Sequence, residues 1–256
     1  MQPQPGYYVG VDGCRKGWVS VVLQDGEAPR LDVYEDIESL WCTHYRADAI
    51  LIDMPIGLPE TGPDERECEI EARQHLGLRR SSVFPVPCRR AVYAESRHAA
   101  VEANRRHMHK SLSLQSLLLC KRIRELDELL RSESRARDVF REAHPELLFC
   151  GMNGGTPMTY AKKTVTGADE RQALLATIVG EEVVAGLMAK GRRYRRRDLQ
   201  GDDVLDALAC AIAVSHPDRL GTLLANPPVD ACGLPMQLVY WRPKGLPNGS
   251  SAGHYL

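Results

Sequence analysis

The stretch Gly201–Asp202–Asp203–Val204–Leu205–Asp206–Ala207–Leu208–Ala209 places three carboxylates at the start of an otherwise apolar helix. One Asp can cap such a helix, because its side chain accepts from backbone N–H groups left unpaired in the first turn. Asp206 lies three and four residues beyond the other two, so all three can lean toward one helix face. Like charges at this spacing repel, so we expect a cation beside them. We predict that Asp203 and Asp206 are metal ligands and that Asp202 is the cap.

The composition is typical of a globular protein. The chain has 256 residues, 43% hydrophobic content and a formal net charge of −1, so overall charge identifies no class of partner. Its eight cysteines are separated by 20 residues or more, which leaves no C-x-x-C pair for zinc or redox chemistry. No apolar run approaches the ~18 residues of a membrane span, and the first residues lack a signal-peptide pattern. We therefore expect free thiols in a cytoplasmic protein with no membrane partner.

Strand-like runs dominate the first part of the chain. Residues 7–12, 18–23 and 30–34 concentrate β-formers between turn-like sequences, which predicts three antiparallel strands. A short helix is expected over 36–45. The apolar run Ala49–Asp53 then has the pattern of a central parallel strand that ends in a carboxylate. With a fifth strand ending before Pro145, this order predicts an α/β protein with a five-stranded mixed sheet flanked by helices.

The remaining elements follow from hydrophobic periodicity and from the residues that break it. A helical insertion is expected after the fourth strand, over about 60–109, with an acidic helix at 64–76 stopped by Gly77 and a polar helix from about 91. Later elements are helices at 111–131 and 169–190, a loop at 151–158 and a final strand at 237–241. We predict one domain over residues 1–242 and a disordered tail over 243–256.

Acidic residues lie at the ends of several of these core elements. Asp12 follows the first strand, Asp53 the fourth, and Asp203 and Asp206 open the last helix, with Glu142 beside the fifth strand as a further candidate. If the strands form one sheet, their acidic ends meet at one edge. Such a cluster suits a pair of Mg²⁺ or Mn²⁺ ions, which take oxygen ligands. Two ions ~4 Å apart can activate a water and stabilise the leaving oxygen of a phosphodiester.

Each acid also has a structural interpretation. Asp12 could be only a turn residue before the next glycine. Glu142 could pair with Arg141 or a lysine as a structural bridge, and His144 is more simply a hydrogen-bonded polar residue than a ligand. Asp53 is harder to explain in this way, because an idle carboxylate beside a buried strand is costly to desolvate. The coincidence of several acids is a stronger signal than any one of them.

Basic residues precede the acidic helix. The segment Lys190–Arg197 carries six cations with Tyr194 interleaved. Such a run is often a solvated face, but its position favours phosphate binding next to a site whose own charge repels a polyanion. The candidate nucleic-acid contacts are Arg15, Lys16, Arg80, Lys162, Lys163, Arg193, Arg195 and Arg196. They do not distinguish RNA from DNA, or a polymer from a mononucleotide.

Several motifs together resemble a known family. The segment 203–213 resembles the last helix of RuvC-type nucleases, where two acids three residues apart bind metal. The closer resemblance is to domain-of-unknown-function family 429, the predicted RNase H-like nucleases, and it covers about residues 7–241. The motifs that carry it are Gly10–Val–Asp–Gly–Cys–Arg–Lys–Gly–Trp18, Ile52–Asp–Met–Pro–Ile–Gly–Leu58, Arg80–Ser–Ser–Val–Phe–Pro85, His144–Pro–Glu146 and Asp202–Asp–Val–Leu–Asp–Ala207.

The resemblance implies an RNase H-like fold and a metal-dependent nuclease. It implies that Asp12 is the first-strand acid, Asp53 the fourth-strand acid, and Asp203 and Asp206 the helix acids, whereas Glu142 matches a family acid of undefined role. Ribonuclease H itself uses a glutamate on its first helix, which this chain lacks unless Glu35 or Glu38 serves. The RuvC-like arrangement therefore fits better.

These observations predict a Mg²⁺- or Mn²⁺-dependent phosphodiesterase that acts on nucleic acid through two ions. The predicted catalytic residues are Asp12, Asp53, Glu142, Asp203 and Asp206. One alternative is an ATP-dependent phosphotransferase of the actin-like kinase type, although no Ser or Thr lies in the turn of 10–18 and no second Gly-rich loop follows Asp53. The other is a non-catalytic nucleic-acid-binding protein whose acidic residues have a structural role. The oligomeric state is not predicted.

Overall fold

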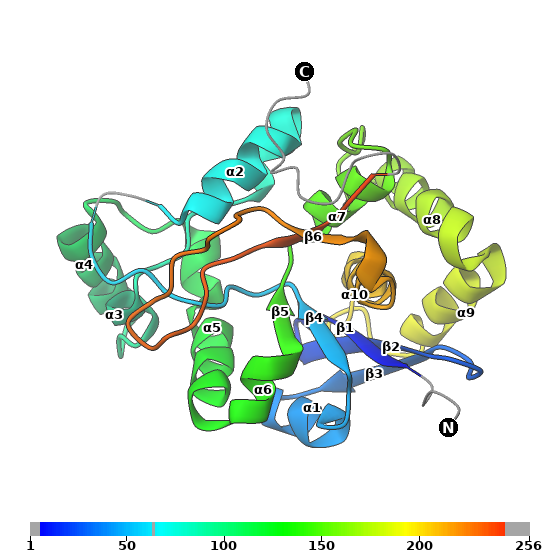
Figure 1. Cartoon of the computed structure of the whole chain (residues 1–256), viewed down its shortest axis with the longest axis horizontal. Helices are drawn as coiled ribbons and strands as arrows, with labels where there is room; N and C mark the ends of the chain where they lie inside the picture. Colours follow the sequence, from blue (N-terminus) through cyan, green and yellow to red (C-terminus); the bar gives the residue numbers. More distant parts are fainter. Residues whose placement is uncertain (1–5, 63–64, 244–256) are drawn as a thin grey trace.

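The five-stranded mixed sheet at the centre of the molecule has the order β3-β2-β1-β4-β5 (Figure 1). The structure is a computed structural model that describes residues 6–62 and 65–243. Strands β1 to β3 pair antiparallel, β4 pairs parallel with β1, and β5 pairs parallel with β4. The predicted α/β class and mixed sheet are confirmed. The strands are β1 (Tyr7–Cys14), β2 (Gly17–Gln24), β3 (Arg30–Tyr34), β4 (Ala49–Ile52) and β5 (Phe140–Glu142).

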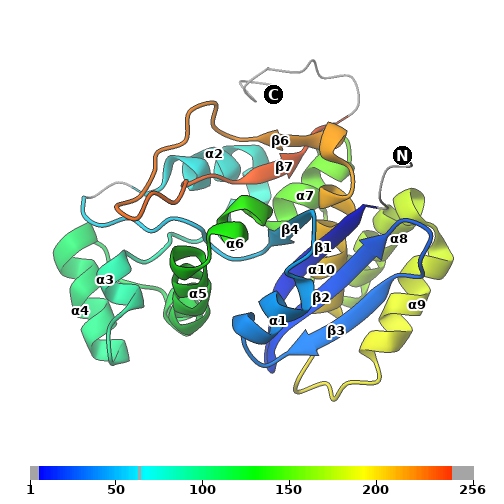
Figure 2. The same ribbon diagram turned by 60° about the horizontal axis from the view of Figure 1, so that its bottom comes forward.

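The two faces of the sheet bury different hydrophobic clusters, because successive side chains of a strand point to opposite faces. Val9, Val11 and Ile50 pack on one face, and Val19 and Leu51 on the other. The helices on the first face are α1 (Ile37–His44), α5 (Leu114–Ser132) and α6 (Ser134–Val139). Those on the second are α7 (Pro145–Met152), α8 (Val165–Val179), α9 (Glu181–Gly191) and α10 (Gly201–Val214). Figure 2 shows the sheet between these layers.

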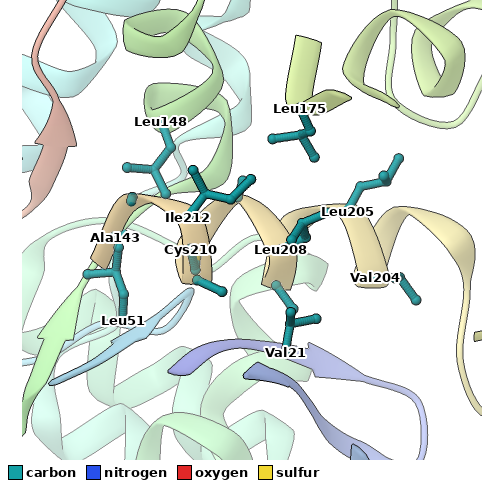
Figure 3. Close-up of a cluster of buried hydrophobic side chains, with 14 of the residues drawn as sticks. Val21, Leu51, Ala143, Leu148, Leu175, Val204, Leu205, Leu208, Cys210 and Ile212 are labelled. Carbon is teal, nitrogen blue, oxygen red and sulfur yellow. The ribbon is translucent and has the colours of Figure 1, made fainter. Parts of the chain in front are cut away.

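Helix α10 is buried on all sides, which explains why it is almost entirely apolar after its first turn. It packs against β1, β2 and β4 below and against α7 and α8 above. Figure 3 shows Leu148 and Leu175 on one side of α10, and Val21 and Leu51 on the other. Asp206 is the exception in this apolar run, and only 1% of it is exposed.

Helix α10 approaches β1 most closely at Gly10. A Cβ atom at this position would lie 2.1 Å from the carbonyl oxygen of Ala207 and 2.1 Å from the backbone nitrogen of Ala211. The strand and the helix are therefore in backbone-to-backbone contact here, and only glycine fits.

The predicted helical insertion lies between β4 and α5, on the side of the molecule away from α8 and α9 (Figure 1). Its elements are α2 (Glu67–Leu76), η1 (Gly77–Ser82), α3 (Arg89–Val92) and α4 (Arg97–Met108). As predicted, α2 ends at Gly77, whose φ of 47° lies in the left-handed region. After α10 the chain continues through η2 (Pro217–Arg219) into a separate antiparallel pair, β6 (Leu220–Thr222) and β7 (Val239–Trp241). Strand β7 is the predicted final strand, although it belongs to this second sheet.

Two predicted elements are corrected. The fifth strand is only three residues long, because α6 occupies 134–139 and Pro145 begins α7. Proline suits this first helical position, where its missing N–H has no partner to lose. The predicted loop at 151–158 therefore starts only after Met152. The single helix predicted over 169–190 is two helices, α8 and α9, which are separated by Gly180 with a φ of 90°.

All eight cysteines lie in the described ranges and are free thiols. Within those ranges no helix combines the length and the hydropathy needed to cross a bilayer. The predicted disordered tail, residues 243–256, lies outside the described residues apart from Pro243.

Candidate metal centre

The register of two parallel strands brings Asp12 and Asp53 together. Val11 pairs with Ile52, so Asp12 and Asp53 lie side by side. Asp53 directly follows β4, whereas Asp12 lies within β1, two residues before its end, rather than after the strand as predicted. The N–H of Asp53 donates to the carbonyl oxygen of Val11 over 2.9 Å, which extends the pairing past β4. Alternation along the strands then directs both side chains toward the face covered by α10.

Asp206 reaches the same place from α10. One carboxylate oxygen from each of Asp12, Asp53 and Asp206 lies within 4.8 Å of the other two, and we call these residues the aspartate triad. Asp12 is 7% exposed and Asp206 1%. Oδ1 of Asp12 accepts from the N–H of Gly13 at 2.6 Å, whereas Oδ1 of Asp206 is buried without a hydrogen-bond partner among the described residues. An orphaned carboxylate oxygen beside two further carboxylates fits a hard divalent cation.

Burial and mutual repulsion disfavour the ionised form of the triad. Burial raises the pKa of Asp53 and of Asp206 to about 6. Burial, followed by the charges of Asp53 and Asp206, raises the pKa of Asp12 well above its ordinary value. Without a further cation the triad therefore holds protons at pH values at which an exposed Asp is ionised.

The cation that the sequence predicts beside the acids is Lys162. Its Nζ lies 2.6 Å from Oδ2 of Asp206. Burial lowers the pKa of a lysine, but the charges of Asp206 and Asp12 outweigh this effect and raise the pKa of Lys162. The loop that carries Lys162 is held by Arg79, whose guanidinium donates to the carbonyl oxygens of Met158 and Thr159 at 2.8 and 2.5 Å. A single lysine offsets one carboxylate of the three.

Asp203 has the capping role that was predicted for Asp202. Gln200 is the N-cap of α10, and its N–H donates to Oδ2 of Asp203 at 2.9 Å, while the Gln200 side chain accepts from the backbone of Asp203. This reciprocal pair is a capping box. The prediction that Asp202 caps the helix is therefore wrong. Asp203 is close enough to raise the pKa of Asp12, but it is not part of the triad.

Glu142, predicted as a catalytic residue, makes structural contacts instead. Its Oε2 accepts from the N–H of Ile56 at 2.7 Å and from Arg66 at 3.0 Å, and its Oε1 pairs with the second Arg66 terminal nitrogen. Glu142 is 6% exposed and Arg66 3%. The partner is thus an arginine of the insertion rather than Arg141 or a lysine. Both oxygens of Glu142 are engaged, so it does not extend the triad.

A cavity of about 500 Å³ opens over the triad. Asp12 and Asp53 lie in its wall together with Lys162 and Lys163. Other parts of the wall come from the insertion and from the start of α5. These residues are Glu69, Arg79, Ser81, Ser82, Val83, Phe84, Val86, Gln115 and Leu119.

Two residues to which sequence reasoning gave no catalytic role also line the cavity, His144 and Glu146. Oε1 of Glu146 pairs with Arg171 at 2.5 Å, and its Oε2 is buried without a partner among the described residues. The charge of Glu146 adds to the burial that raises the pKa of Asp53 and Asp206. Nε2 of His144 lies 3.2 Å from the carbonyl oxygen of Ser82, and burial lowers the pKa of this histidine. The signal that could have identified Glu146 is its place in the first turn of α7, directly after the strand next to β4.

The predicted nucleic-acid contacts fall in two places, and one group lies at the cavity. Lys162 and Lys163 line it. Arg80 is exposed between two lining residues, Arg79 and Ser81.

The other group lies around the turn between β1 and β2. Arg15 and Lys16 are exposed on this turn, and Nζ of Lys16 lies 3.4 Å from Glu35. The N–H of Lys16 donates to the carbonyl oxygen of Asp198 at 3.1 Å, so the arginine run ends beside the same turn. The exposed residues of that run are Arg192, Arg193, Arg195, Arg196 and Arg197. The described lining of the cavity includes none of this second group.

A family model described as "Protein of unknown function (DUF429)" matches residues 10–230, and the chain belongs to this family. The matched range includes the aspartate triad, Lys162 and Glu146. No curated protein matches the sequence. No solved structure matches it either.

Proposed function

We propose that the protein is a Mg²⁺- or Mn²⁺-dependent phosphodiesterase that cleaves a nucleic acid. The proposal rests on three carboxylates whose oxygens lie within 4.8 Å of one another. Asp12 and Asp206 are buried and Asp53 is half-buried, and Asp12 and Asp53 lie in the wall of a cavity. Lys162 compensates one of the three charges, at 2.6 Å from Asp206. A divalent cation would offset the other two and would find the oxygen ligands that it prefers.

Asp12, Asp53 and Asp206 would hold the first ion, with the orphaned Oδ1 of Asp206 as one ligand. The second predicted ion needs further oxygen donors, and the unpartnered Oε2 of Glu146 supports that residue rather than Asp203 or Glu142. When bound, such ions lower the pKa of water and stabilise the leaving oxygen of a phosphodiester.

The lysines at the cavity would orient the substrate. Lys162 and Lys163 both line the cavity, and an ammonium group attracts a phosphate oxygen as a point charge. With a divalent cation on Asp206, the ammonium of Lys162, now 2.6 Å from that carboxylate, would be available to bind phosphate. Nucleic acid as the substrate and the cytoplasm as the location remain predictions.

Cleavage assays with Mn²⁺ test this proposal directly. Purified protein is incubated with labelled RNA, DNA, RNA–DNA hybrid and branched DNA, with Mn²⁺ or with EDTA. We expect Mn²⁺-dependent cleavage of at least one substrate and its loss in Asp53→Asn. Cleavage should be retained in Asp202→Asn, which removes an acid of α10 that lies outside the triad. Absence of cleavage in the whole panel, or full activity of Asp53→Asn, would contradict the proposal.

The two alternatives give different outcomes with the same preparation. Calorimetric titration with ATP would detect binding if the protein is an actin-like phosphotransferase, and we expect none. A non-catalytic protein whose acids are structural would not be stabilised by Mn²⁺. We expect a thermal shift with Mn²⁺ that disappears in Asp206→Asn.

A further inference from the structure

We propose that the cavity binds one unpaired nucleotide, with its phosphate toward the triad and its base against Phe84. This inference rests on the proposed function and names its substrate class. The substrate would be a single strand, a strand end or an extruded nucleotide, rather than a fully paired duplex.

The cavity has two kinds of wall. Its charged part holds Asp12, Asp53 and the two lysines of the loop before α8. The other charged residues of the wall are Glu69, Arg79, Glu142 and Glu146. Its apolar part is formed by Met54, Val83, Phe84, Val86, Leu119 and Leu238. A nucleotide has the same division into a charged phosphate and a base with apolar faces. Its phosphate therefore matches the charged part, and its base matches the apolar part.

Phe84 differs from the other phenylalanines of the chain. Phe140 is 3% exposed and Phe149 0%, and both belong to the hydrophobic core. Phe84 is partly exposed and belongs to none of the core clusters that the described residues form. Its neighbours Val83 and Val86 are 6% and 7% exposed and anchor the segment. An aromatic ring held at a cavity wall but not used by the core is a stacking surface for a base.

The size of the cavity fits a single nucleotide. A volume of about 500 Å³ lies within the range of pockets that enclose small ligands. Its walls are also tied together. Arg79 of the insertion donates to Met158 and Thr159 at 2.8 and 2.5 Å, and His144 lies 3.2 Å from the carbonyl oxygen of Ser82. A base that is stacked and paired in a duplex cannot enter such a site without leaving the stack.

Binding measurements test this inference separately from cleavage. Fluorescence anisotropy compares a labelled single-stranded oligonucleotide with the blunt duplex of the same sequence, with Ca²⁺ in place of Mn²⁺ to prevent turnover. We expect the single strand to bind at least about 10-fold more tightly. Phe84→Ala should weaken this binding by about 5- to 100-fold, and Phe84→Trp should retain it.

Leu78→Ala is the matched control, because Leu78 lies in the same insertion, is 100% exposed and does not line the cavity. We expect this variant to bind like the wild type. Melting curves of the variants establish that each is folded. Competition with a mononucleotide identifies the source of the nucleotide: equal competition indicates a free nucleotide, and weak competition indicates a polymer.

The outcomes separate the two proposals. Equal binding of duplex and single strand, or unchanged binding in Phe84→Ala, would overturn the unpaired-nucleotide inference even if Mn²⁺-dependent cleavage is found. Selective binding of the single strand through Phe84, without cleavage of any substrate, would support the inference and contradict the proposed function.

Discussion

Two regions of this molecule bury carboxylates, and they differ in how far nearby cations compensate the negative charge. In the arginine cluster, three cations face three acids. Its members are Arg66, Arg73, Lys110, Glu65, Glu69 and Glu142. In the aspartate triad, three acids face Lys162. The first region is balanced in charge, whereas the second would carry an excess of two negative charges if all three acids were ionised, and its raised pKa values reflect this.

The difference separates structural acids from candidate ligands. Glu142 has partners on both oxygens, and its contact with Arg66 fastens the insertion to the edge of the sheet. Asp206 has an oxygen without a partner among the described residues. Burial of a charge is costly unless it is paired, so a fold that leaves acids under-compensated points to a role other than stability. Degree of compensation, rather than burial or acidity, distinguishes the two sites.

Arg66→Met should produce the largest effect, because it leaves Glu142 buried and unpaired. We expect the free energy of unfolding to fall by about 3–5 kcal/mol, measured by urea denaturation. Arg80→Met, at an exposed position of the same insertion, should change it by less than about 0.5 kcal/mol. A stable Arg66→Met variant would show that the arginine cluster does not hold the insertion.

Asp53→Asn, in the triad, should have the opposite effect on the stability of the metal-free protein. It removes one of three like charges, so we expect the metal-free protein to become more stable by about 1 kcal/mol while Mn²⁺ no longer raises its melting temperature. Urea denaturation in EDTA and thermal shifts with Mn²⁺ measure the two effects. A loss of stability as large as that of Arg66→Met would show that the triad has a structural role, like the arginine cluster.

The pH dependence of the metal-free protein follows from the raised pKa values. Asp53 and Asp206 have a pKa of about 6 in the folded protein, against ~3.9 in an unfolded chain. Between these values the folded state binds more protons, so these groups reduce stability as pH rises from ~4 to ~6. The stability advantage of Asp53→Asn over wild type in EDTA should therefore grow across this interval. An advantage that is constant with pH would contradict the raised pKa values.

Lys162→Gln tests the compensating cation and should have the smallest effect. Removal of the ammonium that competes for Asp206 should raise Mn²⁺ affinity by about 3- to 10-fold, or about 1 kcal/mol, because Lys162 is partly exposed and its contact is screened. Calorimetric titration measures this change. Lys163→Gln, the adjacent exposed lysine, serves as the control and should leave affinity unchanged. Weaker Mn²⁺ binding in Lys162→Gln would mean that the lysine supports the metal site.

The sequence predicted those parts of the structure that depend on local pattern. Alternation of β-formers identified the strands, and the acids of the triad were visible because each one interrupts an apolar run. The break at Gly180 was missed because the apolar periodicity continues through it. The cap at Asp203 was missed because Gln200 is a weak N-cap residue, so the pattern favoured an Asp in that role.

Contacts between distant residues could not be predicted in the same way. Glu142 and its partner Arg66 are 76 positions apart, and Lys162 and Asp206 are 44 positions apart. Whether an acid is structural or available depends on which cation the fold brings to it. Sequence identified the acids but not their partners. It therefore grouped Glu142 with the catalytic acids and predicted Lys162 only as a nucleic-acid contact.

Gly10 has a consequence for how the protein tolerates mutation. Because α10 rests on the backbone of β1 at this glycine, no side chain separates the helix from the strand there. Any other residue at position 10 would push α10 away from β1 and so change the spacing of Asp12 and Asp206. Position 10 therefore limits which substitutions the site can tolerate, although it lies outside the site itself.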